Sequence, residues 1–215
     1  MQNLPIELYN TPIIGFSNLK DDSVYALERN FGADHYNRLN LVVRTARGSW
    51  ITDIHGRKYL DCLAAYSAAN PGHHHPKIVN ALMRALAGNY ASVISNVVYT
   101  DPLALFLSKT AEFVPQLGPR FGTNGNKVLP KNGVVESVET AIKTARYYGW
   151  EKKNIPDGKQ EIIVFNNNFH GRMITVVSFS TQRKYRTGFG PLTPGFVSVE
   201  FGNLDAVKAA INENT

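Results

Sequence analysis

The side chains with the clearest chemical use lie in a polar segment that runs from Asn166 to Arg172. This segment directly follows a predicted strand at 161–166. Polar residues at the C-terminal end of a parallel strand lie where open α/β sheets bind their ligands. The ring of Phe169 can stack on a planar group, and the Arg172 guanidinium can hold a carboxylate through two hydrogen bonds. The alternative is a solvated loop with one packed phenylalanine.

A second candidate is the turn from Leu129 to Glu136, which connects a predicted strand at 127–130 to a predicted helix at 136–148. Such a turn points free backbone N–H groups at one spot, and the helix dipole adds partial positive charge there, so both effects favour a phosphate. Every parallel α/β unit has turns of this kind. The alternative is therefore an ordinary connection, in which Glu136 and Glu139 only complement the dipole.

Three consecutive histidines, His73 to His75, form the third candidate. Adjacent side chains diverge and no second cluster of ligands accompanies them, so the pattern disfavours a metal site. A polar loop that caps a helix beginning at Pro76 is the better interpretation. Tyr36 and Tyr66 lie in or near irregular segments, where core packing explains an isolated tyrosine more often than function does.

The elements that must position these residues change in character along the chain. The first residues predict an arm with a short helix, and a small antiparallel meander follows, with strands near 41–43, 50–54 and 58–61. Beyond a loop at 64–75, apolar spacing predicts helices at 76–88 and 102–113. Strands and helices then alternate, with strands at 127–130, 161–166, 175–180 and 196–201 and helices at 136–148 and 204–212. This alternation indicates the α/β class, with a mostly parallel sheet covered by helices.

Composition narrows the function classes. The formal net charge is +6, but the basic residues are scattered among acids, and no Lys/Arg run follows a nucleic-acid backbone. Cys62 is the only cysteine, so no intrachain disulfide forms, which fits a reducing compartment. The first residues lack the pattern of a signal peptide, and no apolar stretch reaches the length of a membrane span. We therefore expect a cytoplasmic protein without nucleic-acid or membrane partners.

Five collinear blocks carry a family resemblance. They resemble the G-A-H-N-Y, D-F-L-S-A-Y-S-A-V-N-Q-G-H-C-H-P-K-I, K-V-L-P-M-N-T-G-x-E-A-x-E-T-A-x-K, N-N-F-x-G-R and F-G-P motifs of ornithine aminotransferases. In this sequence they lie at 32–36, 59–79, 127–143, 167–172 and 188–191. The match runs from about residue 23 to the end of the sequence. The chain is thereby similar to the class III aminotransferases, which depend on pyridoxal phosphate.

The resemblance implies an aspartate-aminotransferase fold whose large domain is incomplete. Residues 1–38 would be the N-terminal arm, and residues 39–100 would be the N-terminal part of the small domain with its linking helix. Residues 101–215 would be the first part of the truncated, cofactor-binding large domain. A homodimer or a complementary C-terminal half is the partner that the family implies.

The resemblance also implies site residues and a reaction. The family moves the δ-amino group of ornithine to 2-oxoglutarate, giving glutamate semialdehyde and glutamate. The cofactor phosphate would lie at the turn formed by Gly133, Val134 and Val135. The remaining assignments are Phe169 stacked on the pyridine ring with His170 beside it, Tyr36 and Arg172 at the substrate α-carboxylate, and Tyr66 along the substrate channel.

Departures from the family pattern occur at several positions. The T-G pair at the phosphate reads Gly133-Val134, so a valine would be strained if that glycine position required a positive φ. The S-R-A-F-Y stretch near the family's dimer interface lacks its arginine at 95–99, and the loop at 115–126 is longer than usual.

The later half of the family supplies the glutamate of E-P-I-Q-G-E, the aspartate at the pyridine nitrogen and the lysine that forms the Schiff base. No lysine in residues 1–215 matches that motif, so we expect no catalytic residue here and no transamination by this chain alone. A strand at 127–130 would also lack its neighbours, so we expect the chain to be unstable, aggregated or dependent on a partner.

The alternatives to an aminotransferase fragment are a non-catalytic pseudoenzyme that binds a partner, and a nucleotide-binding module. The latter is disfavoured because no G-x-G-x-x-G follows the 127–130 segment.

Overall fold

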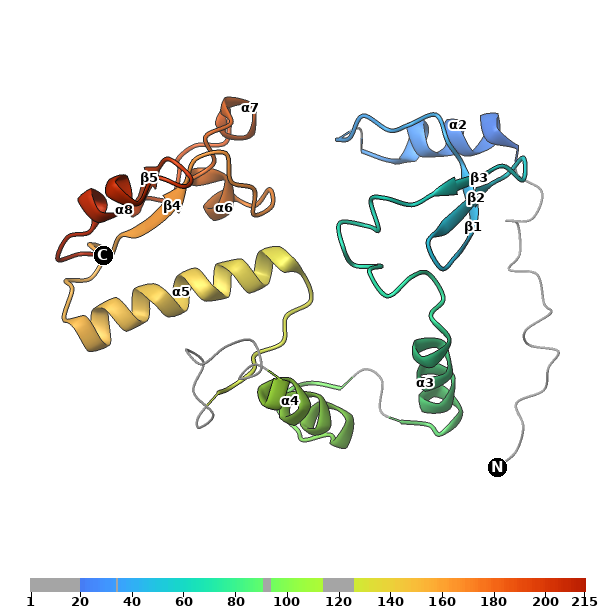
Figure 1. Cartoon of the computed structure of the whole chain (residues 1–215), viewed down its shortest axis with the longest axis horizontal. Helices are drawn as coiled ribbons and strands as arrows, with labels where there is room; N and C mark the ends of the chain where they lie inside the picture. Colours follow the sequence, from blue (N-terminus) through green and yellow to red (C-terminus); the bar gives the residue numbers. More distant parts are fainter. Residues whose placement is uncertain (1–19, 34, 91–93, 114–125) are drawn as a thin grey trace. The chain divides into compact units, whose positions relative to one another are not determined.

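The computed structural model describes residues 20–33, 35–90, 94–113 and 126–215. The chain divides into two compact units, residues 1–100 and 101–215 (Figure 1). Most of the predicted arm and of the predicted loop at 115–126 lies outside the described residues. No helix among the described residues is both long and apolar enough to cross a membrane.

The first unit is built on a three-stranded antiparallel meander. Its strands are β1 (Val43–Arg47), β2 (Trp50–Asp53) and β3 (Lys58–Leu60), in that spatial order. Glycines at positive φ, Gly48 and Gly56, make the two hairpin turns possible. The predicted meander is confirmed, although its first strand begins at Val43 rather than Leu41.

A buried carboxylate holds the second hairpin. Asp53 is 3% exposed, and it accepts hydrogen bonds from the Arg57 Nε (2.7 Å), the Tyr59 hydroxyl (3.1 Å) and the backbone N–H groups of Arg57 (2.8 Å) and His55 (2.9 Å). Burial raises the pKa of the Asp53 carboxyl, but these hydrogen bonds outweigh burial and lower that pKa to about 2. Asp53 is therefore ionised at neutral pH.

Two helices flank the meander in sequence, α2 (Asp21–Phe31) and α3 (Pro76–Ala87). The start of α3 follows the predicted pattern, because Pro76 occupies its first turn and the His75 ring accepts a hydrogen bond from the Lys77 N–H (3.3 Å). Gly88 ends the helix, as predicted. Between β3 and α3 the chain follows a series of turns.

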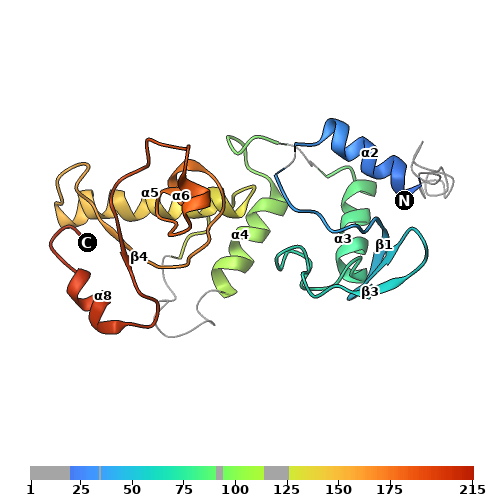
Figure 2. The same cartoon turned by 90° about the horizontal axis from the view of Figure 1, so that it is seen from above.

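The second unit is an α/β arrangement around a parallel strand pair. Strands β4 (Ile162–Phe165) and β5 (Phe196–Val199) pair from Ile162↔Phe196 to Phe165↔Val199. Helices α5 and α6 lie side by side over the buried core (Figure 2). That core joins Ile142 of α5 with Val176 and Phe179 of the α6 region. The unit's helices are α4 (Asp101–Phe113), α5 (Val134–Lys153), α6 (Ile174–Ser178), α7 (Arg183–Arg186) and α8 (Leu204–Ala210).

Two strand predictions in this unit are wrong. Residues 127–130 form no strand and pair with no described strand. A strand needs a neighbour to satisfy its backbone N–H and C=O groups, and this segment has none among the described strands. Residues 175–180 were predicted as a strand from their β-branched run, yet residues 174–178 form helix α6. Val176 and Val177 are buried there, so tertiary packing overrides the local propensity.

The predicted end of the long helix at Gly149 is also wrong. Helix α5 continues to Lys153 and ends at Asn154, whose φ of 56° provides the left-handed cap. A Cβ on Gly149 would lie 3.2 Å from the Gln160 side chain and 3.3 Å from that of Ile155. Gly149 therefore serves close packing inside the helix.

Candidate active site

The N-terminus of α5 is a strong electrostatic feature of the second unit. Gly133 is its N-cap residue in extended conformation (φ −141°, ψ 164°), and no side chain caps the helix. The first intrahelical bond runs from the Ser137 N–H to the Gly133 carbonyl (3.2 Å). The preceding N–H groups, from Val134 to Glu136, therefore have no partner within the helix, and the positive end of a 20-residue helix lies behind them.

The side chain of Glu136 lies over this helix end. A Cβ built on Gly133 would collide with the Glu136 carboxylate, so glycine leaves room for that side chain. A carboxylate near a helix N-terminus is favoured by the dipole, and the Glu136 carboxylate lies where the same dipole would also favour an anionic ligand. Val134 has no positive φ and forms the first turn of α5, so the condition for a strained valine is not met.

Several hydrogen bonds hold the segment 166–172 in place. The Asn166 N–H donates to the Val199 carbonyl of β5 (2.8 Å), and the Asn168 amide makes two further bonds. The Asn168 Nδ2 donates to the carbonyls of Phe165 (2.6 Å) and Phe179 (3.1 Å). The Asn168 Oδ1 lies 3.1 Å from the Nδ1 of His170, whose ring packs against Phe179 at 5.3 Å between centroids. Asn168 thus fixes both the segment and the half-buried His170 ring.

A close contact joins this segment to the start of α5. Gly171 has a φ of 117°, and a Cβ at this position would overlap the Val135 Cγ2. Both observations require glycine. The two segments that sequence reasoning treated as separate candidates therefore meet at the Val135–Gly171 contact.

Aromatic and basic groups gather next to this contact. Phe169 is 62% exposed, and its ring lies edge-to-face with Tyr185 of α7 at 6.0 Å. The Arg172 Cζ lies 5.3 Å from the centre of the same Tyr185 ring, and the Lys184 Nζ lies 5.1 Å from it. Tyr185 therefore links the residue predicted to stack on a ring with the residue predicted to hold a carboxylate.

Sequence reasoning missed both Asn168 and Tyr185 as supporting residues. Asn168 lay inside a matched motif without an assigned role, and Tyr185 lies three residues before the matched block at Gly188. The signal for Tyr185 was an aromatic residue inside a basic run, from Arg183 to Arg186.

The two predicted substrate tyrosines belong to the first unit. Tyr36 is 46% exposed, and its ring lies 4.4 Å from that of His35. Tyr66 is 77% exposed and lies in the turns between β3 and α3, with a φ of 56°. Both rings are accessible to a small molecule within their own unit.

The three histidines face three different partners. The His73 Nε2 lies 2.7 Å from the Asp61 carboxylate, and the His74 Nδ1 lies 2.9 Å from the Ala46 carbonyl. His75 caps α3, as described above. Across the described part of the chain, no three potential metal ligands gather at one point.

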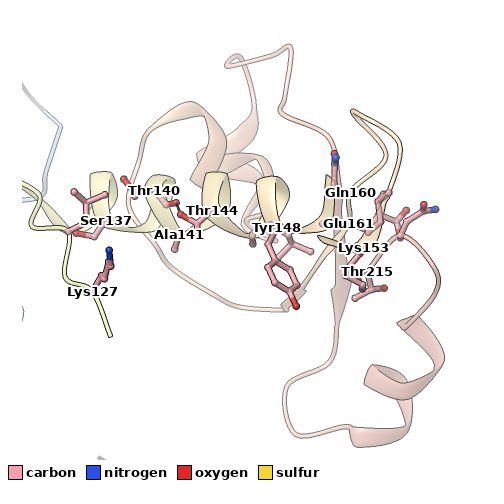
Figure 3. A pocket seen from close by; sticks show the side chains of 16 residues that line it. Lys127, Ser137, Thr140, Ala141, Thr144, Tyr148, Lys153, Gln160, Glu161 and Thr215 are labelled. Atoms are coloured by element: carbon pink, nitrogen blue, oxygen red, sulfur yellow. Dashed lines mark hydrogen bonds between the residues drawn. The ribbon is translucent and has the colours of Figure 1, made fainter. Parts of the chain in front are cut away.

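A separate groove runs along α5, with a volume of about 830 Å³ (Figure 3). Its α5 wall consists of small or polar residues, one lysine and one aromatic residue: Ser137, Thr140, Ala141, Thr144, Ala145, Tyr148, Gly149 and Lys153. The other walls come from segments near 127–129, 160–162 and 214–215. Phe169 and Arg172 do not line this groove, so it is distinct from the site at the Val135–Gly171 contact.

Comparison with known proteins places this geometry in a defined class. The structure matches ornithine aminotransferase from Toxoplasma gondii with a TM-score of 0.78 and 28% identity, covering 97% of this chain and 46% of that one. It matches ornithine δ-aminotransferase from Plasmodium falciparum with a TM-score of 0.72 and 28% identity, covering 91% and 43%. The fold is thus that of the pyridoxal-phosphate-dependent aminotransferases, as predicted.

Sequence comparison gives the family. The model of the class III aminotransferases matches residues 31–214. The ornithine aminotransferase of Staphylococcus carnosus is 43% identical over 196 residues, which cover 91% of this chain and 47% of the relative. That of an Exiguobacterium species is 44% identical over 196 residues, covering 91% and 46%. The chain belongs to the class III aminotransferase family, and it spans about half the length of the curated relatives it matches.

Proposed function

We propose that this chain is the N-terminal part of an ornithine-type aminotransferase, which transfers the δ-amino group of ornithine to 2-oxoglutarate with pyridoxal phosphate. The observation that carries the proposal is the Val135–Gly171 contact. It sets an uncapped helix N-terminus beside an accessible phenylalanine ring and an arginine. Together they would supply a phosphate site, a stacking surface and a carboxylate site at one place.

The residues present fit the cofactor. The N–H groups at the start of α5, beside Gly133, Val134 and Val135, would hold its phosphate, and Phe169 would stack on its ring with His170 beside it. When bound, the cofactor supplies an electron sink for negative charge that develops next to the reacting nitrogen. Asn168 contributes indirectly, because its side chain ties the residue before Phe169 to the carbonyls of Phe165 and Phe179.

Three other side chains would bind the amino-acid substrate. Arg172 would hold the α-carboxylate in a bidentate pair, with Tyr36 at the same end. Tyr66 would line the channel that the amino-acid chain occupies. These residues bind and orient, and the amine that bonds the cofactor and moves the proton would come from a complementary half, such as the family's C-terminal half.

Exposed apolar surface supports dependence on a partner. Among the described residues, Val97 is 87% exposed, Leu129 is 65% exposed and Tyr148 is 59% exposed. Leu129 and Tyr148 line the groove along α5. Apolar surface of this kind marks an interaction site. We propose a complementary half or a second copy of the chain as the partner.

The test uses the chain with and without a C-terminal half taken from a relative. Pyridoxal phosphate is added, visible absorbance is recorded, and conversion of ornithine with 2-oxoglutarate is measured. We expect turnover only when both halves are present. Unaided turnover by the 215-residue chain would contradict the assignment of the amine to the other half.

A non-catalytic role is the second candidate, and the N-terminus of α5 favours it. The family's T-G pair is replaced by Gly133-Val134, and the Glu136 carboxylate lies where an anion would approach. If the halves assemble without turnover, the double variant Gly133→Thr, Val134→Gly should be tested. Recovery of cofactor binding by that variant would identify a pseudoenzyme that lost its phosphate site.

A further inference from the structure

The segment 61–73 forms a closed loop in the first unit. At one end, the Asp61 N–H donates to the Ser49 carbonyl (2.8 Å). At the other end, Gly48 and His73 exchange two backbone hydrogen bonds of 2.9 and 2.8 Å. Both ends are therefore fastened to the β1–β2 turn, as in compact surface loops whose ends meet.

The interior of this loop has an unusual backbone. Four consecutive residues from Ala64 to Ser67 have φ between 47° and 73°, and none of them is glycine. L-residues disfavour this left-handed conformation, and a run of them persists only where surrounding interactions hold it. Backbone hydrogen bonds of the run include Tyr66 N–H to the Leu63 carbonyl and Ala69 N–H to the Ala64 carbonyl, both at 3.0 Å.

One side-chain contact, between Asp61 and His73, reaches from the start of the run to the end of the loop. The Asp61 Oδ1 accepts from the N–H groups of Leu63 (3.1 Å) and Ala64 (2.8 Å), and its Oδ2 lies 2.7 Å from the His73 Nε2. The side chains are only 14% and 26% exposed. The hydrogen bonds from His73 and from the Ala64 and Leu63 backbone lower the pKa of the Asp61 carboxyl, so it stays ionised at neutral pH.

We propose that Asp61 and His73 are positioning residues that close this loop and present the Tyr66 ring to the amino-acid substrate. Asp61 fixes the entry into the left-handed run, and His73 fixes Asp61. His74 and His75 bond outside the loop, which separates their roles from that of His73. The closure rests on the geometry above, whereas the role of Tyr66 rests on the proposed function.

Hydrogen exchange on the full chain tests the closure. The variants are Asp61→Ala, His73→Ala and His73→Gln, and His74→Gln is the matched control. Loss of a charge-assisted hydrogen bond should accelerate exchange of amides 62–72 by about 10- to 100-fold in both alanine variants, with the amides of β1, β2 and β3 changed less than about threefold. The amide of His73→Gln can still donate to Asp61, so this variant should stay near the wild type. Unchanged loop exchange in the alanine variants, or equal acceleration in the loop and the strands, would overturn the proposal.

Kinetics of the chain assembled with a complementary half test the purpose of the closure. We expect Asp61→Ala to raise KM for ornithine about tenfold and to change kcat by less than about threefold. His73→Gln should keep a KM near that of the wild type. A fall in kcat at unchanged KM would overturn substrate positioning. If the wild-type assembly shows no turnover, the proposed function fails, and the exchange result still decides whether Asp61 and His73 close the loop.

Discussion

Two exposed aromatic residues assigned to small-molecule binding, Tyr66 and Phe169, are held in place by different physical means. The loop around Tyr66 depends on the contact between Asp61 and His73 and on backbone hydrogen bonds to a hairpin turn. The segment around Phe169 depends on close packing of Gly171 against Val135 and on one amide that binds two carbonyls. The first closure should therefore be sensitive to the loss of a hydrogen-bonding side chain, and the second to a change in side-chain volume.

The largest expected effect follows from the packed closure. Gly171→Ala adds a Cβ that overlaps Val135 at a φ of 117°, so we expect a loss of about 3 kcal/mol in the free energy of unfolding. Gly188→Ala is the matched control, because Gly188 has a φ of 85° but open space around it. That control should cost only about 1–2 kcal/mol, for the backbone alone. Urea unfolding measures both variants.

Equal losses in the two variants would show that the Val135 contact exerts no steric constraint. A double variant, Gly171→Ala with Val135→Ala, sharpens the result. Removing the Val135 methyl groups should recover the steric part of the loss and leave the backbone part, unless the deleted methyl groups destabilise the core.

A second prediction concerns the polar framework of the first unit. The pKa of Asp53 is lowered from its ordinary value of 3.8 to about 2, so the folded state favours the ionised form. Its contribution to stability is complete above pH 3.8 and is lost as pH falls towards about 2. We expect the first unit to lose stability over that pH range, and Asp53→Asn to reduce the pH dependence.

The two tryptophans allow this measurement in each unit separately. Trp50 lies in β2 and Trp150 in α5. Trp150→Phe leaves Trp50 to report urea unfolding of the first unit, and Trp50→Phe leaves Trp150 for the second. A Trp50 transition that moves with pH equally with and without Asp53 would refute the assignment.

The same contrast explains how much sequence reasoning could achieve. Local signals, such as Pro76 and Gly88 at the ends of α3 and the glycines of the hairpin turns, predicted elements that the structure contains. Gly149 and the β-branched run in the predicted strand at 175–180 led to wrong predictions because their packing partners lie elsewhere in the sequence: Gln160 packs on Gly149, and Ile142 packs with Val176. The contact between Val135 and Gly171 could not be foreseen for the same reason, since no periodicity or motif spacing encodes a pair 36 positions apart.

A third prediction tests whether Tyr185 couples Phe169, proposed to stack on the cofactor, to Arg172, proposed to bind the carboxylate. Tyr185→Ala removes the ring that contacts both Phe169 and Arg172, so we expect KM for ornithine to rise about fivefold in the assembled enzyme. Tyr185→Phe keeps the ring and should retain most of the affinity. Tyr147→Ala serves as a control, because Tyr147 is another tyrosine of the same unit and contacts Trp150 instead. An equal rise in KM for Tyr147→Ala would remove the case for Tyr185.

The smallest effect on stability is expected at the α5 N-terminus, where a change should separate stability from binding. Serine is a slightly better N-cap than glycine, so Gly133→Ser should change the free energy of unfolding by no more than about 0.5 kcal/mol. Its Cβ would displace the flexible Glu136 side chain, and its hydroxyl would accept from an N–H group that is otherwise available to a phosphate. Binding of pyridoxal phosphate should therefore weaken while the unfolding midpoint stays nearly constant. Isothermal titration and urea unfolding of the same preparation measure the two quantities, and unchanged affinity would mean that the phosphate is not held by these N–H groups.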